Sequence, residues 1–236
     1  MDLSLLAWGD SGWGDEMFWS GALMTIAIAT CSFLLGIVFA VAAAAAKLSG
    51  NILYSSIANV YTTVMRGVPE LLIIYLVFFG AGQVLRNVAV LFGYTEYFDL
   101  PVFVTGMVCI GASSGAYSTE VIRGAVLAVP KGQLEAAKAI GMRKGMMLWR
   151  ILVPQAARFA LPGLGNVWQV TLKETALISV IGLADVMRKA AEGAGSTKEP
   201  FTFYLTAAVI FYLITKVSGR GFIFAEGWAN KGVRRA

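Results

Sequence analysis

Histidine is absent from this chain, and ionisable residues are scarce in it. Among 236 residues there are no His and two Cys, and Asp, Glu, Lys and Arg together make up 14%, against about a quarter in an average soluble domain. The sequence has no cluster of metal-ligating residues and no nucleophile beside a base. These absences make a membrane enzyme a weak hypothesis, and they leave no evident metal site.

Two further features exclude other classes of protein. The G-x-x-x-x-G-K-[ST] pattern is missing, so any use of ATP must depend on another chain. Cys31 and Cys109 both fall in apolar runs, where they are expected to be small hydrophobic residues inside helices. The net charge is +5, but the basic residues gather in particular loops, as membrane topology requires, and do not indicate a nucleic-acid surface.

The chain is rich in long runs of apolar residues. Hydrophobic residues make up 58% of it, and several windows of about 20 residues are almost free of charge, the length that crosses a bilayer core as a helix. Only helices and closed barrels satisfy every backbone polar group in lipid, and no sustained period-2 alternation is present. The sequence therefore predicts an all-α integral membrane protein with a single domain over residues 1–236.

The apolar runs predict five transmembrane spans, at about residues 17–46, 52–85, 101–123, 159–177 and 201–224. The first has an acidic flank and is too long for a signal peptide. The second is too long for one straight crossing, and Gly67 and Pro69 are expected to break it. Glu70 would then begin the next segment as an acid at the positive end of a helix.

Loop charges predict the orientation. The first 16 residues hold four acids and no base, whereas seven Lys and Arg lie between residues 123 and 158. The tail from residue 216 holds five bases and one acid. Because basic loops stay in the cytoplasm, we expect the N-terminus outside, the C-terminus inside, and the loop at 130–154 on the cytoplasmic side.

The sequence of that loop predicts two short helices. The stretch QLEAAKA is rich in helix formers, and Gly141 interrupts it as a C-cap or hinge would. The stretch KGMMLWRIL can form a second, amphipathic helix, which Pro154 is expected to end. Such a helix either lies on the lipid surface or sits in a groove of a soluble partner, and the residues alone leave both uses open.

Ionisable residues within spans are costly and mark functional positions. Arg66 precedes the predicted break, where freed backbone groups can help to build a substrate site. Glu120 either forms an i,i+3 ion pair with Arg123 or faces a translocation path.

The fourth predicted span carries a polar face. Asn166, Gln169 and Lys173 share one helical stripe, and Glu174 lies on the adjoining one. This face suits the lining of a cavity. The alternative is that Lys173 and Glu174 reach the outer headgroups.

A resemblance extends this interpretation. The spacing Glu135-Ala136-Ala137, three residues, Gly141, nine residues, Ile151, two residues, Pro154 resembles the EAA loop of permease subunits of bacterial ABC importers. The stretches RGVPELLIIYLVFFG, LPGLGNVWQV and LKETALISVIGLADV are similar to the polar amino acid group of that family. The greatest likeness is to Q-type subunits of histidine/lysine/arginine/ornithine and opine permeases. It covers nearly the whole chain and is weakest over residues 1–16.

The resemblance implies the five-helix fold of type I ABC importer permeases, in a multi-pass protein of the bacterial inner membrane. It implies that residues 130–154 form a coupling helix docked into a cytoplasmic ATPase. Glu135 would cap the first helix or contact the ATPase, and Gly141 would let the chain turn. The implied partners are a second permease chain (a sister or a copy), two ATPase subunits that bind ATP and Mg, and a periplasmic binding protein. The chain itself would hold no cofactor.

The resemblance also implies that Glu120 and Glu174 line a mid-membrane substrate pocket, although many relatives carry Asp at the position of Glu174. Two carboxylates suit a cationic side chain, so the expected substrates are basic amino acids (arginine, lysine, histidine, ornithine) or opines. Arg66 or Lys173 would meet the substrate carboxylate. An ion-coupled secondary transporter is the alternative, but it predicts an inverted repeat, and the sequence shows none.

Overall fold

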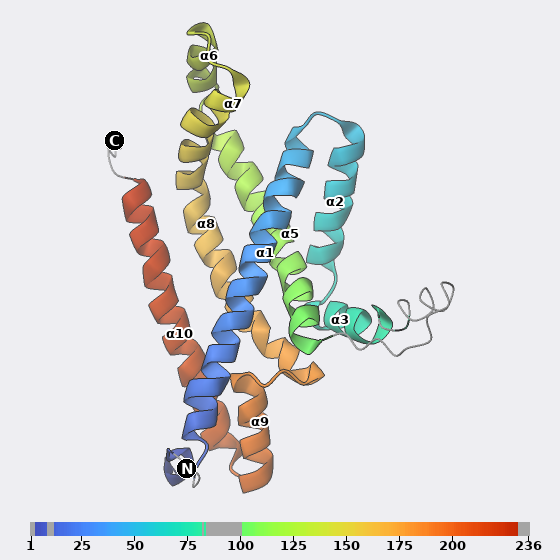
Figure 1. Ribbon diagram of the computed structural model, residues 1–236, viewed down its shortest axis with the longest axis vertical. Coiled ribbons are helices and arrows are strands. Elements are labelled where there is room, and N and C mark those ends of the chain that lie inside the picture. Colours follow the sequence, from blue (N-terminus) through green and yellow to red (C-terminus); the bar gives the residue numbers. More distant parts are fainter. Residues whose placement is uncertain (1–2, 9–11, 82, 84–100, 231–236) are drawn as a thin grey trace.

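A computed structural model describes residues 3–8, 12–81, 83 and 101–230, and every regular element in these ranges is helical (Figure 1). The elements are η1 Leu3–Leu6, η2 Asp15–Gly21, α1 Ala22–Leu48, α2 Ile52–Gly67, α3 Glu70–Tyr75, η3 Leu76–Ala81, α5 Val102–Ala128, α6 Lys131–Ala139, α7 Lys144–Met147, η4 Leu148–Leu152, α8 Val153–Glu174, η5 Thr175–Ile181, α9 Val186–Thr197 and α10 Pro200–Ala229.

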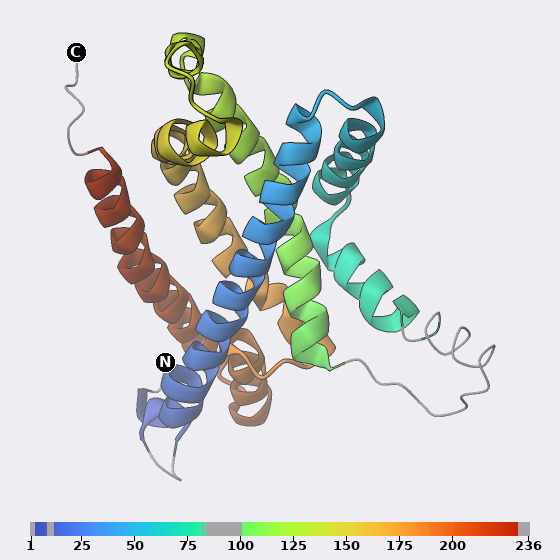
Figure 2. The same cartoon turned by 45° about the horizontal axis from the view of Figure 1, so that its top comes forward.

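The centre of the bundle is the pair α1 and α5, which pack along each other through small residues. A Cβ on Gly36 would lie 2.9 Å from the carbonyl oxygen of Gly111 and 3.0 Å from the amide nitrogen of Gly115. Only glycine permits such an approach, and small residues at helix interfaces are typical of membrane bundles. Helices α2 and α8 flank this pair, and α10 lies outside α8 (Figures 1 and 2).

A sharp break follows α2. Helix α2 ends at Gly67, Val68 is extended, and Pro69 is the N-cap of α3, which begins at Glu70. The two helical segments are bent by 107° (Figure 2). The break predicted at Gly67 and Pro69 is therefore confirmed. The end of the predicted second span, at residues 84–85, lies outside the described residues.

Three helices in the described part of the chain are long and apolar enough to cross a membrane: Asp15–Leu48, Val102–Ala128 and Pro200–Ala229. A fourth is added if the bent pair is counted as one span. Helix α8 is not among them, because its polar residues lower its hydropathy. The five-crossing count therefore stays a prediction.

The two ends of the bundle differ in content. The N-terminal η2 and the short helix α9 lie at one end, and α6 and α7 lie at the other (Figure 1). Helices α9 and α10 pack on η2 around the buried side chains of Met17, Val186 and Phe203. Helix α5 runs to the end that holds α6 and α7 (Figure 1). The position of a residue in α5 therefore tells how far it lies from that end.

Candidate functional site

One face of α5 carries polar contacts on three successive turns. Ser113, Tyr117 and Glu120 are spaced i, i+4 and i+7, which places them on one side of the helix. At 1.5 Å per residue, Ser113 and Glu120 are about 10 Å apart along the axis, with Glu120 nearer the α6 end. Each of the three meets a side chain from another helix.

At the level of Ser113, two carboxyl groups meet. Glu70 is the first residue of α3 and Glu174 the last of α8, and their carboxyl groups lie close enough to interact, with the Ser113 side chain beside Glu70. Glu70 Oε1 and Glu174 Oε2 are buried and have no hydrogen-bond partner within the described residues. Buried carboxylates are costly unless a cation or donor satisfies them, so this pair is suited to receive one.

Sequence reasoning missed Glu70 as a site residue and favoured its role as a helix-terminal acid. The structure supports both properties, because Glu70 begins α3 and also faces Glu174. Glu70 and Glu174 are more than 100 residues apart in the chain, so no local sequence pattern indicates that they meet. The break at Gly67 and Pro69 was the available signal.

At the level of Glu120, an ion-pair network joins three helices. Lys47 Nζ donates to Glu120 Oε1 at 2.5 Å and to Thr62 Oγ1 at 2.6 Å, and Arg123 Nε donates to Glu120 Oε2 at 3.0 Å. The predicted i,i+3 pair is therefore present. Sequence reasoning missed Lys47, which is the one charge at the end of the alanine tract of α1. A substrate contact by Glu120 stays a prediction.

Arg66 lies between these two levels. Its guanidinium is 5.5 Å from the ring centroid of Tyr117, a cation–π distance. In the part of the chain that the structure describes, Arg66 forms no salt bridge. It sits in the last turn of α2, directly before the break, so it keeps hydrogen-bond donors for an anion.

The polar stripe predicted on α8 divides between two grooves. Asn166 and Gln169 line a groove of about 470 Å³ between α8 and α10, opposite Lys216 and Arg220. Lys173 lines a separate groove of about 410 Å³ with residues of α9 and α10. The structure thus does not gather the predicted residues into one described pocket, and Glu174 alone among those on α8 meets Glu70. Their roles as substrate ligands remain predictions.

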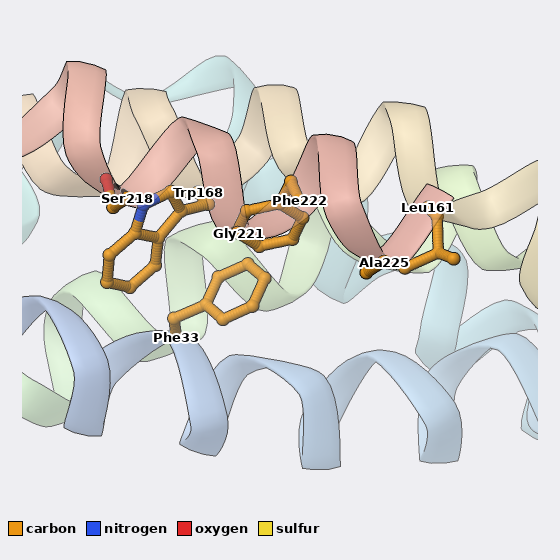
Figure 3. Close-up of a pocket in the computed structure, with 7 residues that line it drawn as sticks. All are labelled: Phe33, Leu161, Trp168, Ser218, Gly221, Phe222 and Ala225. Carbon is orange, nitrogen blue, oxygen red and sulfur yellow. Dashed lines mark hydrogen bonds between the residues drawn. The ribbon is translucent and has the colours of Figure 1, made fainter. Parts of the chain in front are cut away.

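An aromatic pocket of about 360 Å³ lies between α1, α8 and α10 (Figure 3). Phe33, Trp168 and Phe222 surround it, and Trp168 Nε1 donates to the Ser218 hydroxyl at 2.9 Å. Because none of the residues that line it is ionisable, this pocket offers no charge for a polar ligand.

The predicted coupling loop forms α6, α7 and η4. Glu135, Ala136 and Ala137 lie on α6, and Gly141 follows it in the left-handed region at φ 76°. The predicted interruption at Gly141 is confirmed. Ile140 and Trp149 are 77% and 71% exposed, which leaves apolar side chains available at this end of the molecule.

The prediction that Pro154 ends a helix is wrong. Helical backbone continues from α7 through η4, which contains Ile151, into α8, and Pro154 lies in the first turn of α8. Pro154 lacks an N–H, and the π-helical turn η4 directly before α8 lets the helix continue past it. The loop is therefore joined rigidly to α8.

A charged cluster lies at the opposite end of the bundle. Asp185 is buried and caps α9 by accepting from the Arg188 amide at 2.8 Å. Burial raises the pKa of Asp185 to about 6. The carboxylate of Glu16, 2.7 Å from Lys189, raises the pKa of that lysine, and Arg188 lowers the pKa of Glu192.

A helical bundle with membrane-length helices, a broken helix at its edge and buried carboxyl groups beside that break is the architecture of a polytopic membrane protein. The chain belongs to the family of binding-protein-dependent transport system inner membrane components, which matches residues 32–223.

Relatives in this family cover almost the whole chain. The chain is 64% identical to the nopaline transport system permease protein NocQ of Agrobacterium fabrum, over 99% of both chains. It is 51% identical to the octopine transport system permease protein OccQ of Rhizobium radiobacter, over 100% of this chain and 99% of the relative. It is 42% identical to the histidine/lysine/arginine/ornithine transport system permease protein HisQ of Escherichia coli, over 92% and 94%.

Solved structures share the fold. A crystal structure of an amino acid ABC transporter with histidines matches with a TM-score of 0.74 at 32% identity, covering 89% of this chain and 92% of that chain. The MetNI methionine ABC transporter in an inward-facing conformation matches with a TM-score of 0.64 at 14% identity, over 89% and 96%. The second likeness concerns the fold alone.

Proposed function

We propose that this chain is the membrane-spanning subunit of an ATP-driven importer for opines or basic amino acids. The names of the relatives mention nopaline, octopine and the amino acids histidine, lysine, arginine and ornithine. The basic amino acids share a side chain that can carry a positive charge, and two carboxyl groups that face each other are an arrangement that binds a cation.

The observation that carries the proposal is the meeting of Glu70 and Glu174. Each has a buried carboxyl oxygen without a hydrogen-bond partner in the described part of the chain, and a bound guanidinium would satisfy both. Arg66 is four residues before Glu70, on the other side of the break, and in this proposal it meets the carboxylate of the same substrate. Glu120 lies nearer the α6 end and is paired with Lys47 and Arg123, so in this proposal it meets a departing cation only by exchanging one of these partners.

The partners follow from the family. A periplasmic binding protein delivers the substrate, and two ATPase subunits bind ATP and Mg and receive the loop at 130–154. A second permease chain, a sister or a copy, completes the membrane part. In this arrangement the chain crosses the bacterial inner membrane five times, with the N-terminus outside and the C-terminus inside, and it binds no nucleic acid.

The test is uptake of radiolabelled arginine into proteoliposomes that contain the chain with its sister permease, ATPase and binding protein. We expect Glu70→Gln and Glu174→Gln each to lower ATP-dependent uptake at least about tenfold, because one charge-assisted bond to a buried cation is lost. Glu192→Gln on α9, an acid outside the pair that is paired with Arg188 and Lys189, is the matched control and should leave uptake unchanged.

Two outcomes would contradict the proposal. If both Gln variants transport arginine at the normal rate, the carboxylate pair does not bind the substrate. If the chain alone takes up arginine along an ion gradient without ATP, the secondary transporter is the correct alternative, and the exposed loop at 130–154 has no coupling role.

A further inference from the structure

Helix α2 has little apolar packing. Its buried residues are Ala58 and Thr62, and its large apolar side chains are mostly exposed, among them Ile52, Leu53, Ile57, Val60 and Val64. A groove of about 520 Å³ lies between α2 and the α1–α5 pair, lined largely by small or apolar side chains such as Ala46 and Ala112. Interdigitated side chains therefore do not fix the position of α2.

Polar contacts hold α2 instead. Lys47 Nζ on α1 donates to Thr62 at 2.6 Å and to Glu120 on α5 at 2.5 Å, so one buried ammonium joins three helices. The Tyr61 hydroxyl donates to the carbonyl oxygen of Ala112 at 2.6 Å. These contacts and the stacking of Arg66 on Tyr117 cover two successive turns of α2.

The position of α2 determines the position of the site. Val68 and Pro69 alone separate α2 from α3, and the ring of Pro69 fixes one of the intervening backbone angles. A rotation or shift of α2 therefore moves Arg66 and Glu70 together, relative to Ser113 and to Glu174. We propose that Lys47 and Tyr61 are positioning residues for substrate recognition, a proposal that rests on the proposed function.

Stability alone does not account for Lys47. Its side chain is 7% exposed, and exchange of a buried ion pair for apolar residues of similar size is often neutral or stabilising. The α1–α5 contact is already held by the close approach of Gly36 to Gly111 and Gly115. A lysine at this position fixes the orientation of α2 relative to α1 and α5, because its ammonium group must contact both Thr62 and Glu120.

The experiment compares two substrates that differ in length. Uptake of arginine and of ornithine is measured in the complete reconstituted importer for wild type, Lys47→Met, Tyr61→Phe and the conservative Lys47→Arg. We expect the arginine-to-ornithine uptake ratio to change at least about fivefold in Lys47→Met and Tyr61→Phe, because displacement of a site by about 1 Å alters productive binding strongly. Lys47→Arg should restore most of the wild-type ratio.

A purely structural role lowers both rates equally and leaves the ratio unchanged, and that result would overturn the proposal. A second measurement does not depend on the substrate. Spin labels at exposed Val60 on α2 and exposed Leu127 on α5 should give a narrow distance distribution in the wild type and a broader one in the Lys47→Met, Tyr61→Phe double variant. An unchanged distribution would also overturn the proposal.

If the wild-type importer takes up neither amino acid while the spin-label distances respond as expected, the proposed substrate class is wrong and the positioning of α2 stands. The two proposals therefore fail in different measurements.

Discussion

At the scale of single residues, the unusual property of this chain is the number of polar groups that it holds within apolar helices. Lys47 and Glu120 satisfy each other at 2.5 Å, as buried charges must. Glu70 and Glu174 face each other with unpartnered oxygens. The first arrangement is complete within the chain, whereas the second keeps one free oxygen on each carboxyl group. The first can therefore hold helices together, and the second can bind a cation.

Asp185 gives a prediction at this scale. Its pKa of about 6 lies above its ordinary value of about 3.9, so its contribution to stability is full below about pH 4 and is lost as the pH rises through 6. Asp185→Asn keeps the oxygen that caps α9 and removes the titration. We expect the melting temperature of wild type, relative to this variant, to fall by several degrees between pH 4 and pH 7 in detergent.

Asp15→Asn, at an exposed acid of η2, controls for the removal of one negative charge. Melting profiles of wild type and Asp185→Asn that stay parallel across this pH range would show that burial does not perturb Asp185.

At the scale of elements, the predicted coupling loop depends on one residue with an unusual backbone conformation. Gly141 adopts φ 76° with open space around it, so its role is conformational. Gly132 in α6 also has open space but a helical backbone. The two glycines form a matched pair within one loop.

We expect Gly141→Ala to weaken binding of the ATPase about fivefold, because a left-handed conformation costs a residue with a side chain about 1 kcal/mol. Gly132→Ala should bind normally, since alanine favours the helix there. The measurement is an affinity titration of the purified ATPase against permease in nanodiscs. Equal affinities for both variants would mean that the turn at Gly141 does not set the docking surface.

Elements with a local cause could be predicted from the sequence, and their tertiary contacts could not. The break after α2 follows from Gly67 and Pro69, and the turn at Gly141 follows from glycine itself. The pairing of Lys47 with Glu120 joins positions 73 residues apart, and no local pattern encodes it. Pro154 was misread because a proline that ends a helix and a proline that follows a π-helical turn look alike in the sequence.

At the scale of the whole molecule, the polar side of α8 must be shielded from lipid. It is too polar to pass as a membrane span alone, and Asn166 and Lys173 lie on its exposed side. Polar groups in hydrocarbon are costly, so a neighbouring polar surface must shield this side of α8. We expect the second permease chain proposed above to provide that surface.

The predicted sidedness can be tested on intact cells with single cysteines that replace exposed residues at the two ends. We expect Lys144→Cys in α7 to react with an impermeant maleimide only after the membrane is opened. Ser196→Cys in α9 should react from outside, because α7 and α9 lie at opposite ends of the bundle (Figure 1). Both cysteines reacting from the same side would contradict an odd number of crossings between them.

The Lys47–Glu120 contact also bears on how the protein is made. A charge that follows a long apolar helix stays with the headgroups when that helix is alone in the bilayer. Its partner is synthesised 73 residues later, so Lys47 reaches its buried position only after α5 has entered the membrane. During biogenesis the same lysine would thus act twice, first among the headgroups at the end of α1 and later as the link between α1 and α5.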